Sequence, residues 1–131
     1  MDLKKTVELR KTVEERLDLM IQAEMISENT AAFCAEAAEL MLKEPGDRDG
    51  EKLNMFITHL AMAADRMERG KTGEEAIDAG VFETVRRAPC FGEAVRLRDS
   101  ILKAAPAEFT EAEADFLTIH LCNLLTEIDE A

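Results

Sequence analysis

The amino-acid sequence predicts an all-α fold, a compact bundle of about six helices that forms a single domain. Its 131 residues have room for one hydrophobic core, and their hydrophobic content of 47% is enough to build that core. With six Phe and no Trp or Tyr, aromatic side chains are scarce, whereas Ala, Leu, Met and Glu are abundant. This composition favours helix over sheet and predicts an aliphatic core.

Apolar residues recur at helical spacing along the first half of the chain and predict three helices there. The first runs from about Leu3 to Glu24, and the second from about Glu28 to Lys43 with Ser27 as its cap. Pro45–Gly50 combines helix breakers with turn formers and predicts an exposed loop before the third helix, from about Glu51 to Glu68. The apolar positions of the first helix are Val7, Leu9, Val13, Leu17, Met20, Ile21 and Met25.

Three further helices are predicted in the second half of the chain. Thr72 or Gly73 caps a fourth from about Glu74 to Arg87, and a fifth runs from about Phe91 to Ala104. Thr110-Glu111-Ala112-Glu113 matches the capping box, in which the Thr hydroxyl and the Glu carboxylate satisfy backbone donors reciprocally. It marks the start of a sixth helix, which continues to the end of the chain.

Charge, hydropathy and cysteine content exclude several classes of function. The formal net charge of −12 repels phosphate backbones, so direct nucleic-acid binding is not expected. No apolar stretch approaches the roughly 20 residues that span a bilayer, and the N-terminus lacks the apolar core of a signal peptide. Cys34, Cys90 and Cys122 are odd in number and far apart, which predicts buried thiols rather than a disulfide framework or a zinc site. A cytoplasmic protein without membrane contact is expected.

The only two histidines, His59 and His120, are the candidate functional residues. Each lies beside the apolar stripe of its predicted helix, where a side chain borders the core and still reaches solvent. Arg66 follows His59 by one heptad and Glu113 precedes His120 by one heptad, so both lie on the same helical face as their histidine. A neutral imidazole accepts phosphoryl groups, and a guanidinium stabilises the dianionic product. Glu113 is expected to orient His120 and raise its pKa.

Other interpretations of the same residues remain open. Either histidine can be a satisfied core or boundary residue without chemistry, and burial of both in apolar packing would decide for this alternative. A metal site from His59, His120 and Glu113 lacks short ligand spacing, so neither a metal nor another cofactor is expected. With no Gly-rich phosphate loop or nucleophile elbow, an enzyme is not predicted either. Six methionines are expected to fill the core, namely Met20, Met25, Met41, Met55, Met62 and Met67.

Two segments resemble the signatures of the PTS regulation domain. Asn54–Gly70, with its His59-Leu60 pair followed by Arg66 and Gly70, is similar to the first signature. Phe109–Leu121 is similar to the second, an acidic helix start followed by His-Leu. The order and separation of the two segments also agree with the family, and the resemblance extends over residues 30–125.

The resemblance implies a five-helix bundle over residues 27–131, to which residues 1–26 add an N-terminal helix that is expected to pack on it. It implies that His59 and His120 are phosphoacceptors, with Arg66 and Glu113 as supporting neighbours. The implied partners are a histidine phosphocarrier protein or sugar-specific phosphotransferase components, and a second copy in a homodimer. Family regulators carry such domains in tandem behind a nucleic-acid-binding head. A single domain therefore points to a phosphorylation-responsive interaction module, the alternative being a structural helical interaction protein.

Overall fold

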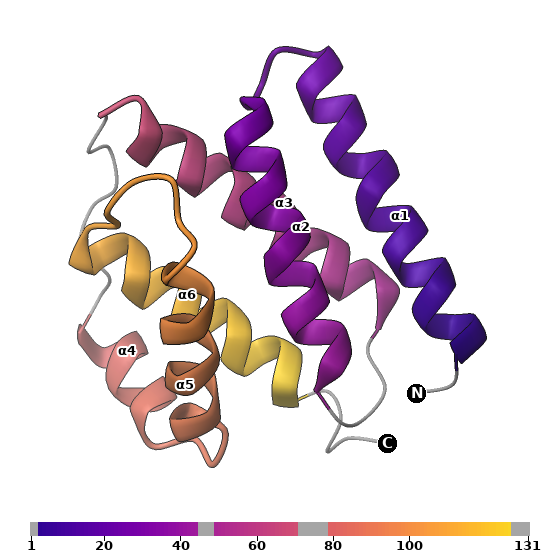
Figure 1. Ribbon diagram of the computed structural model, residues 1–131. Coiled ribbons are helices and arrows are strands. Elements are labelled where there is room, and N and C mark those ends of the chain that lie inside the picture. Colours follow the sequence, from indigo (N-terminus) through magenta and orange to yellow (C-terminus); the bar gives the residue numbers. More distant parts are fainter. Residues whose placement is uncertain (1–2, 45–48, 71–78, 127–131) are drawn as a thin grey trace.

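The part of the chain that the structure describes folds into six helices, in line with the sequence prediction (Figure 1). The computed structural model describes residues 3–44, 49–70 and 79–126, and within these ranges no strand is present. The helices are α1 (Leu3–Gln22), α2 (Glu28–Lys43), α3 (Gly50–Glu68), α4 (Ala79–Arg86), α5 (Phe91–Leu102) and α6 (Glu111–Thr126). The all-α prediction is confirmed. None of the helices in these ranges is long and apolar enough to cross a membrane.

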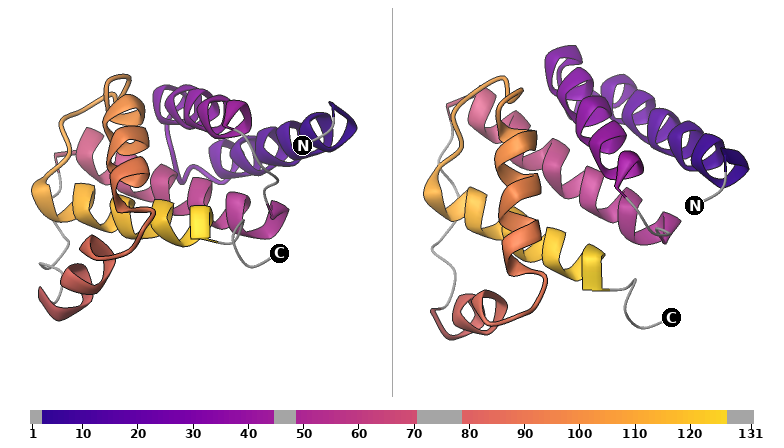
Figure 2. Two further views of the ribbon diagram at one scale, coloured as in Figure 1. Left: turned by 90° about the horizontal axis from the view of Figure 1, so that it is seen from below. Right: turned by 60° about the horizontal axis from the view of Figure 1, so that its bottom comes forward.

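Helices α3 and α6 lie side by side although a large part of the chain separates them (Figure 2). In the left-hand view α2 and α5 cross above this pair, and α4 lies below it next to α6. Helix α1 runs beside α2 and also contacts α3. The α3–α6 pair therefore joins the N-terminal and C-terminal halves of the bundle, and both histidines belong to it.

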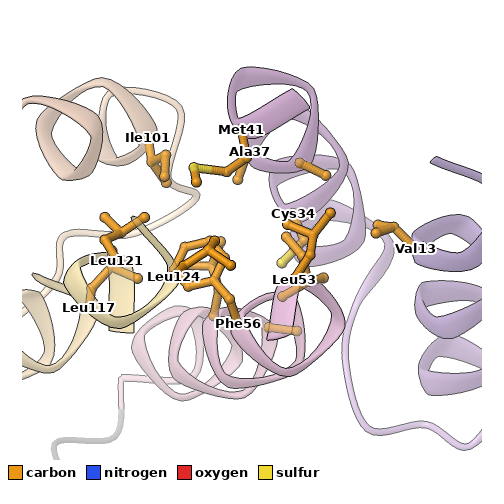
Figure 3. Close-up of a cluster of buried hydrophobic side chains, with 14 of the residues drawn as sticks. Val13, Cys34, Ala37, Met41, Leu53, Phe56, Ile101, Leu117, Leu121 and Leu124 are labelled. Atoms are coloured by element: carbon orange, nitrogen blue, oxygen red, sulfur yellow. The ribbon is translucent and has the colours of Figure 1, made fainter. Parts of the chain in front are cut away.

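The core is aliphatic, as the composition predicts. Five of the helices contribute to one buried cluster, whose labelled members in Figure 3 are Val13, Cys34, Ala37, Met41, Leu53, Phe56, Ile101, Leu117, Leu121 and Leu124. Leu121 is completely buried in the middle of α6. Helix α4 reaches this cluster through the half-buried Val85. Burial of one face of each long helix fixes which residues of α3 and α6 are left to form a site.

The N-terminal helix packs on the bundle, which was the expected arrangement. Its buried residues are Leu9, Val13, Leu17 and Met20, and they follow one face. Arg10 of α1 donates two hydrogen bonds to the Glu39 carboxylate of α2, at 2.6 and 2.9 Å. Val7 and Met25, which were predicted to share the apolar face, are exposed, and Met25 lies beyond the end of α1, after the turn at Glu24.

Side-chain caps fix where three helices begin. The Ser27 hydroxyl accepts from the Thr30 backbone N–H, and the Thr110 hydroxyl accepts from that of Glu113, so both predicted caps are confirmed. Asp49 accepts from two backbone N–H groups and starts α3 one residue before the predicted position. The expected reciprocal bond of the capping box is replaced, because the Glu113 carboxylate binds Arg66 of α3.

Some helix ends differ from the prediction. Helix α1 ends two residues early because Glu24, with φ at 60°, turns the chain. Helix α5 ends at Leu102 in a turn rather than at Ala104. Helix α4 begins at Ala79, and the predicted cap at Thr72 or Gly73 lies outside the described residues. The same holds for residues 45–48 of the predicted loop and for the chain after residue 126.

Candidate functional site

The two histidine rings are in direct contact. His59 of α3 and His120 of α6 stack with their ring centroids 4.5 Å apart and their planes 12° from parallel. His59 is exposed and His120 is half-buried. Burial of both histidines in apolar packing, which would have decided for the alternative without chemistry, is not observed. The bundle brings together the two residues that the sequence singled out and leaves them in reach of solvent.

The pKa of His120 is lowered from its ordinary value of 6.5, first by burial and then by the neighbouring His59. The sequence predicted a raised pKa for His120, because the negative charge of Glu113 was expected to favour the protonated ring. In the structure Glu113 is engaged by Arg66, so that desolvation decides the direction. His120 therefore favours its neutral form near pH 7, with one ring nitrogen carrying a lone pair.

Arg66 and Glu113 pair with each other across the α3–α6 contact. Arg66 Nε and Nη2 donate to Glu113 Oε2 at 3.0 and 2.7 Å. The Glu113 side chain is only 3% exposed and that of Arg66 is 30% exposed. A carboxylate at this depth requires its cation, because an uncompensated buried charge is costly. The two predicted supporting residues thus form one buried link between the helices that carry the histidines.

All four predicted residues line one cleft of about 260 Å³ between α3 and α6. Its other walls are largely apolar and consist of Leu60, Met62, Ala63, Phe109, Phe116 and Leu117. The sequence did not predict the apolar walls: Met62 was expected in the core but is exposed, as are Met25 and Met55. Helical spacing holds the missing signal, because Met62 follows His59 by three residues and Phe116 precedes His120 by four.

The cleft offers two imidazoles, one guanidinium held by a carboxylate, and largely apolar walls. Within residues 3–44, 49–70 and 79–126, no three His, Cys, Asp or Glu side chains are grouped so that they could hold a metal ion. A neutral imidazole nitrogen in this cleft can accept an electrophilic group such as a phosphoryl group. The Arg66 guanidinium can stabilise a negatively charged product.

Comparison of the chain with protein-family models, curated proteins and solved structures finds no match. The resemblance to the PTS regulation domain, carried by the segments around His59 and His120, therefore stays a prediction. What the site can do is argued below from its own residues and their geometry.

Proposed function

We propose that this chain is a phosphorylation-responsive regulatory module that accepts a phosphoryl group on His59 or His120. The donor is a histidine phosphocarrier protein or a sugar-specific component of the phosphotransferase system. The observation that carries the proposal is the stacked histidine pair at a cleft that also contains Arg66. Two histidines that serve only packing have no reason to meet at a solvent-accessible cleft beside a guanidinium.

The transfer exchanges one nitrogen–phosphorus bond for another. The neutral acceptor imidazole attacks the phosphorus atom with its ring lone pair, and the bond to the donor histidine breaks. The donor ring regains its lone pair, so charge and atoms balance without any further reactant. Burial and the His59 ring lower the pKa of His120, which supports this step because only the unprotonated nitrogen is a nucleophile.

The response follows from the charge that transfer adds. A phosphoryl group brings about two negative charges at neutral pH and three acceptor oxygens into the cleft. It competes with Glu113 for the Arg66 guanidinium, which is bound at 2.7 Å before transfer. When Arg66 turns to the phosphoryl group, the buried Glu113 carboxylate loses its cation, and the first turn of α6 is destabilised. A changed α3–α6 packing, and through it a changed homodimer contact, is the proposed output.

A second candidate function is a structural interaction protein in which the histidines accept nothing. Met55 and Met62 favour it, because both are exposed on the α3 face that carries His59. Exposed methionines are common on surfaces that bind other proteins. The two candidates differ in one measurable property, the presence of phosphate on histidine.

The deciding experiment incubates the purified protein with the phosphocarrier, the enzyme that charges it, and phosphoenolpyruvate. We expect one added phosphoryl mass that is lost in acid and kept in alkali. Fragmentation should locate it on one of the two rings. The variants His59→Gln and His120→Gln identify the acceptor, with a known acceptor protein as positive control. Labelling of the control but not of this protein would favour the second candidate.

A further inference from the structure

Two cysteines from different parts of the chain meet where the start of α5 contacts α6. Cys90 directly precedes α5, and Cys122 lies near the end of α6, two residues after His120. The Cys90 Sγ lies 3.6 Å from the Cys122 backbone oxygen, although 32 positions separate the two residues. This contact brings the start of α5 against the C-terminal half of α6. The third cysteine, Cys34, lies in α2 and belongs to the core cluster.

We propose that Cys90 and Cys122 form a thiol-oxidation site that closes to an intramolecular disulfide when the chain meets a disulfide oxidant such as oxidised glutathione. The approach of the Cys90 sulfur to within 3.6 Å of the Cys122 backbone oxygen supplies the proximity that this bond requires. The proposal is independent of histidine phosphorylation. It concerns a transient bond, because a reducing compartment reopens such disulfides.

Exposure sets the order of the two steps. Cys90 is half-buried and within reach of solvent, whereas Cys122 is 5% exposed. Burial, and the contact with Cys90, raise the pKa of Cys122 to about 12, which disfavours it as the first thiolate. Cys34 is completely buried, and burial likewise raises its pKa to about 12. Cys90 is therefore the attacking thiol and Cys122 the resolving one.

The chemistry balances with glutathione disulfide as the named oxidant. The Cys90 thiolate attacks one glutathione sulfur, forming a mixed disulfide and releasing the first glutathione thiol. The Cys122 thiol then loses its proton and attacks the Cys90 sulfur, which releases the second glutathione thiol. Two protein thiols are oxidised, and one glutathione disulfide is reduced to two thiols.

The bond would tie the start of α5 to α6 close to the histidine pair. Because a cross-link removes conformational freedom from the unfolded chain, the oxidised protein should melt several degrees higher than the reduced one. This shift gives a second readout that a mixed disulfide with glutathione on Cys90 would not produce.

The test treats the folded full-length chain with oxidised glutathione, followed by alkylation and peptide mapping without reductant. We expect an intact mass lower by two hydrogens, a cross-linked peptide pair containing Cys90 and Cys122, and reversal by dithiothreitol. Cys34→Ala is the matched control and should close the bond as the natural chain does. Cys90→Ser should remain unmodified, and Cys122→Ser should stop at the mixed disulfide.

Three outcomes would overturn the proposal. In the first, the unsubstituted chain keeps all three thiols after treatment. In the second, oxidation stops at a mixed disulfide between glutathione and Cys90. In the third, the disulfide involves Cys34 or joins two copies of the chain. The unsubstituted chain by itself distinguishes these three outcomes from the expected Cys90–Cys122 disulfide. The conclusion therefore does not depend on whether every variant folds.

Discussion

The imidazole rings of His59 and His120 stack 4.5 Å apart, each supplied by a different helix. Two imidazolium ions at this distance repel each other, so a proton on one ring disfavours a proton on the other. The His59 ring accordingly adds to the effect of burial in lowering the pKa of His120. At this distance, a charge added to one ring also changes the electrostatic potential at the other.

We predict that His120 titrates below its ordinary pKa of 6.5, because burial and the neighbouring His59 both disfavour its charged form. Since the chain has two histidines, proton NMR titration resolves both rings. His59→Gln should move the pKa of His120 only part of the way back, because burial is the larger cause. A His120 pKa at or above 6.5 in the natural chain would contradict this prediction.

The same shift predicts the pH dependence of stability. The unfolded chain protonates His120 near pH 6.5, while the folded chain resists protonation until a lower pH. The unfolded state therefore binds more protons in this window, and the free energy of unfolding falls as pH falls below about 6.5. Urea unfolding at a series of pH values measures it, and His120→Gln should remove part of the slope.

Arg66→Ala should lower the free energy of unfolding by roughly 2–3 kcal/mol, because it leaves the Glu113 carboxylate buried without its cation. The expected loss is no larger than the usual cost of removing one partner of a buried ion pair, because the Arg66 side chain is 30% exposed and solvent screens part of the interaction. Denaturant unfolding measures it. In the double variant with Glu113→Ala the two losses should not add. Additive losses would show that the pair does not link α3 to α6.

Arg66→Ala should also shorten the lifetime of phosphate on histidine, by about tenfold if the guanidinium donates one charge-assisted hydrogen bond to it. Arg69→Ala is the matched control, because Arg69 also follows His59 on this chain segment but pairs with Asp65 and does not line the cleft. Loss of the phosphoryl mass over time gives both lifetimes. Equal lifetimes in the two variants would remove Arg66 from the proposed role.

Leu121→Ala should lower the free energy of unfolding by about 2–5 kcal/mol, because it opens a cavity at a fully buried position of α6. Leu19→Ala removes the same atoms from a side chain that is 63% exposed and should cost less than about 0.5 kcal/mol. Thermal or urea unfolding of the two variants measures the difference. Similar losses would mean that α6 does not pack as described.

The sequence predicts the fold well where one local signal decides. Ser27 and Thr110 are caps because their hydroxyls satisfy backbone donors within three residues, which spacing alone reveals. It fails where tertiary contacts decide. Val7 and Met25 continue the apolar spacing of α1, yet both are exposed, and Met25 lies beyond the helix end at Gln22.

The candidate site is predictable in its residues but not in their partners. Helical spacing placed Arg66 with His59 and Glu113 with His120, each within its own helix. The packing of α3 against α6 instead joins Arg66 to Glu113, which a pattern within one helix does not contain. For the same reason the direction of the His120 pKa shift could not be read from the sequence.

The central claim is that one of the stacked histidines accepts a phosphoryl group. Mass spectrometry of the protein charged by the phosphocarrier system tests it most directly. The account predicts acid-labile phosphate on His59 or His120 in the natural chain, and none in the folded double variant with His59→Gln and His120→Gln. Phosphate on neither ring of the natural chain, under conditions that charge a known acceptor, would contradict it.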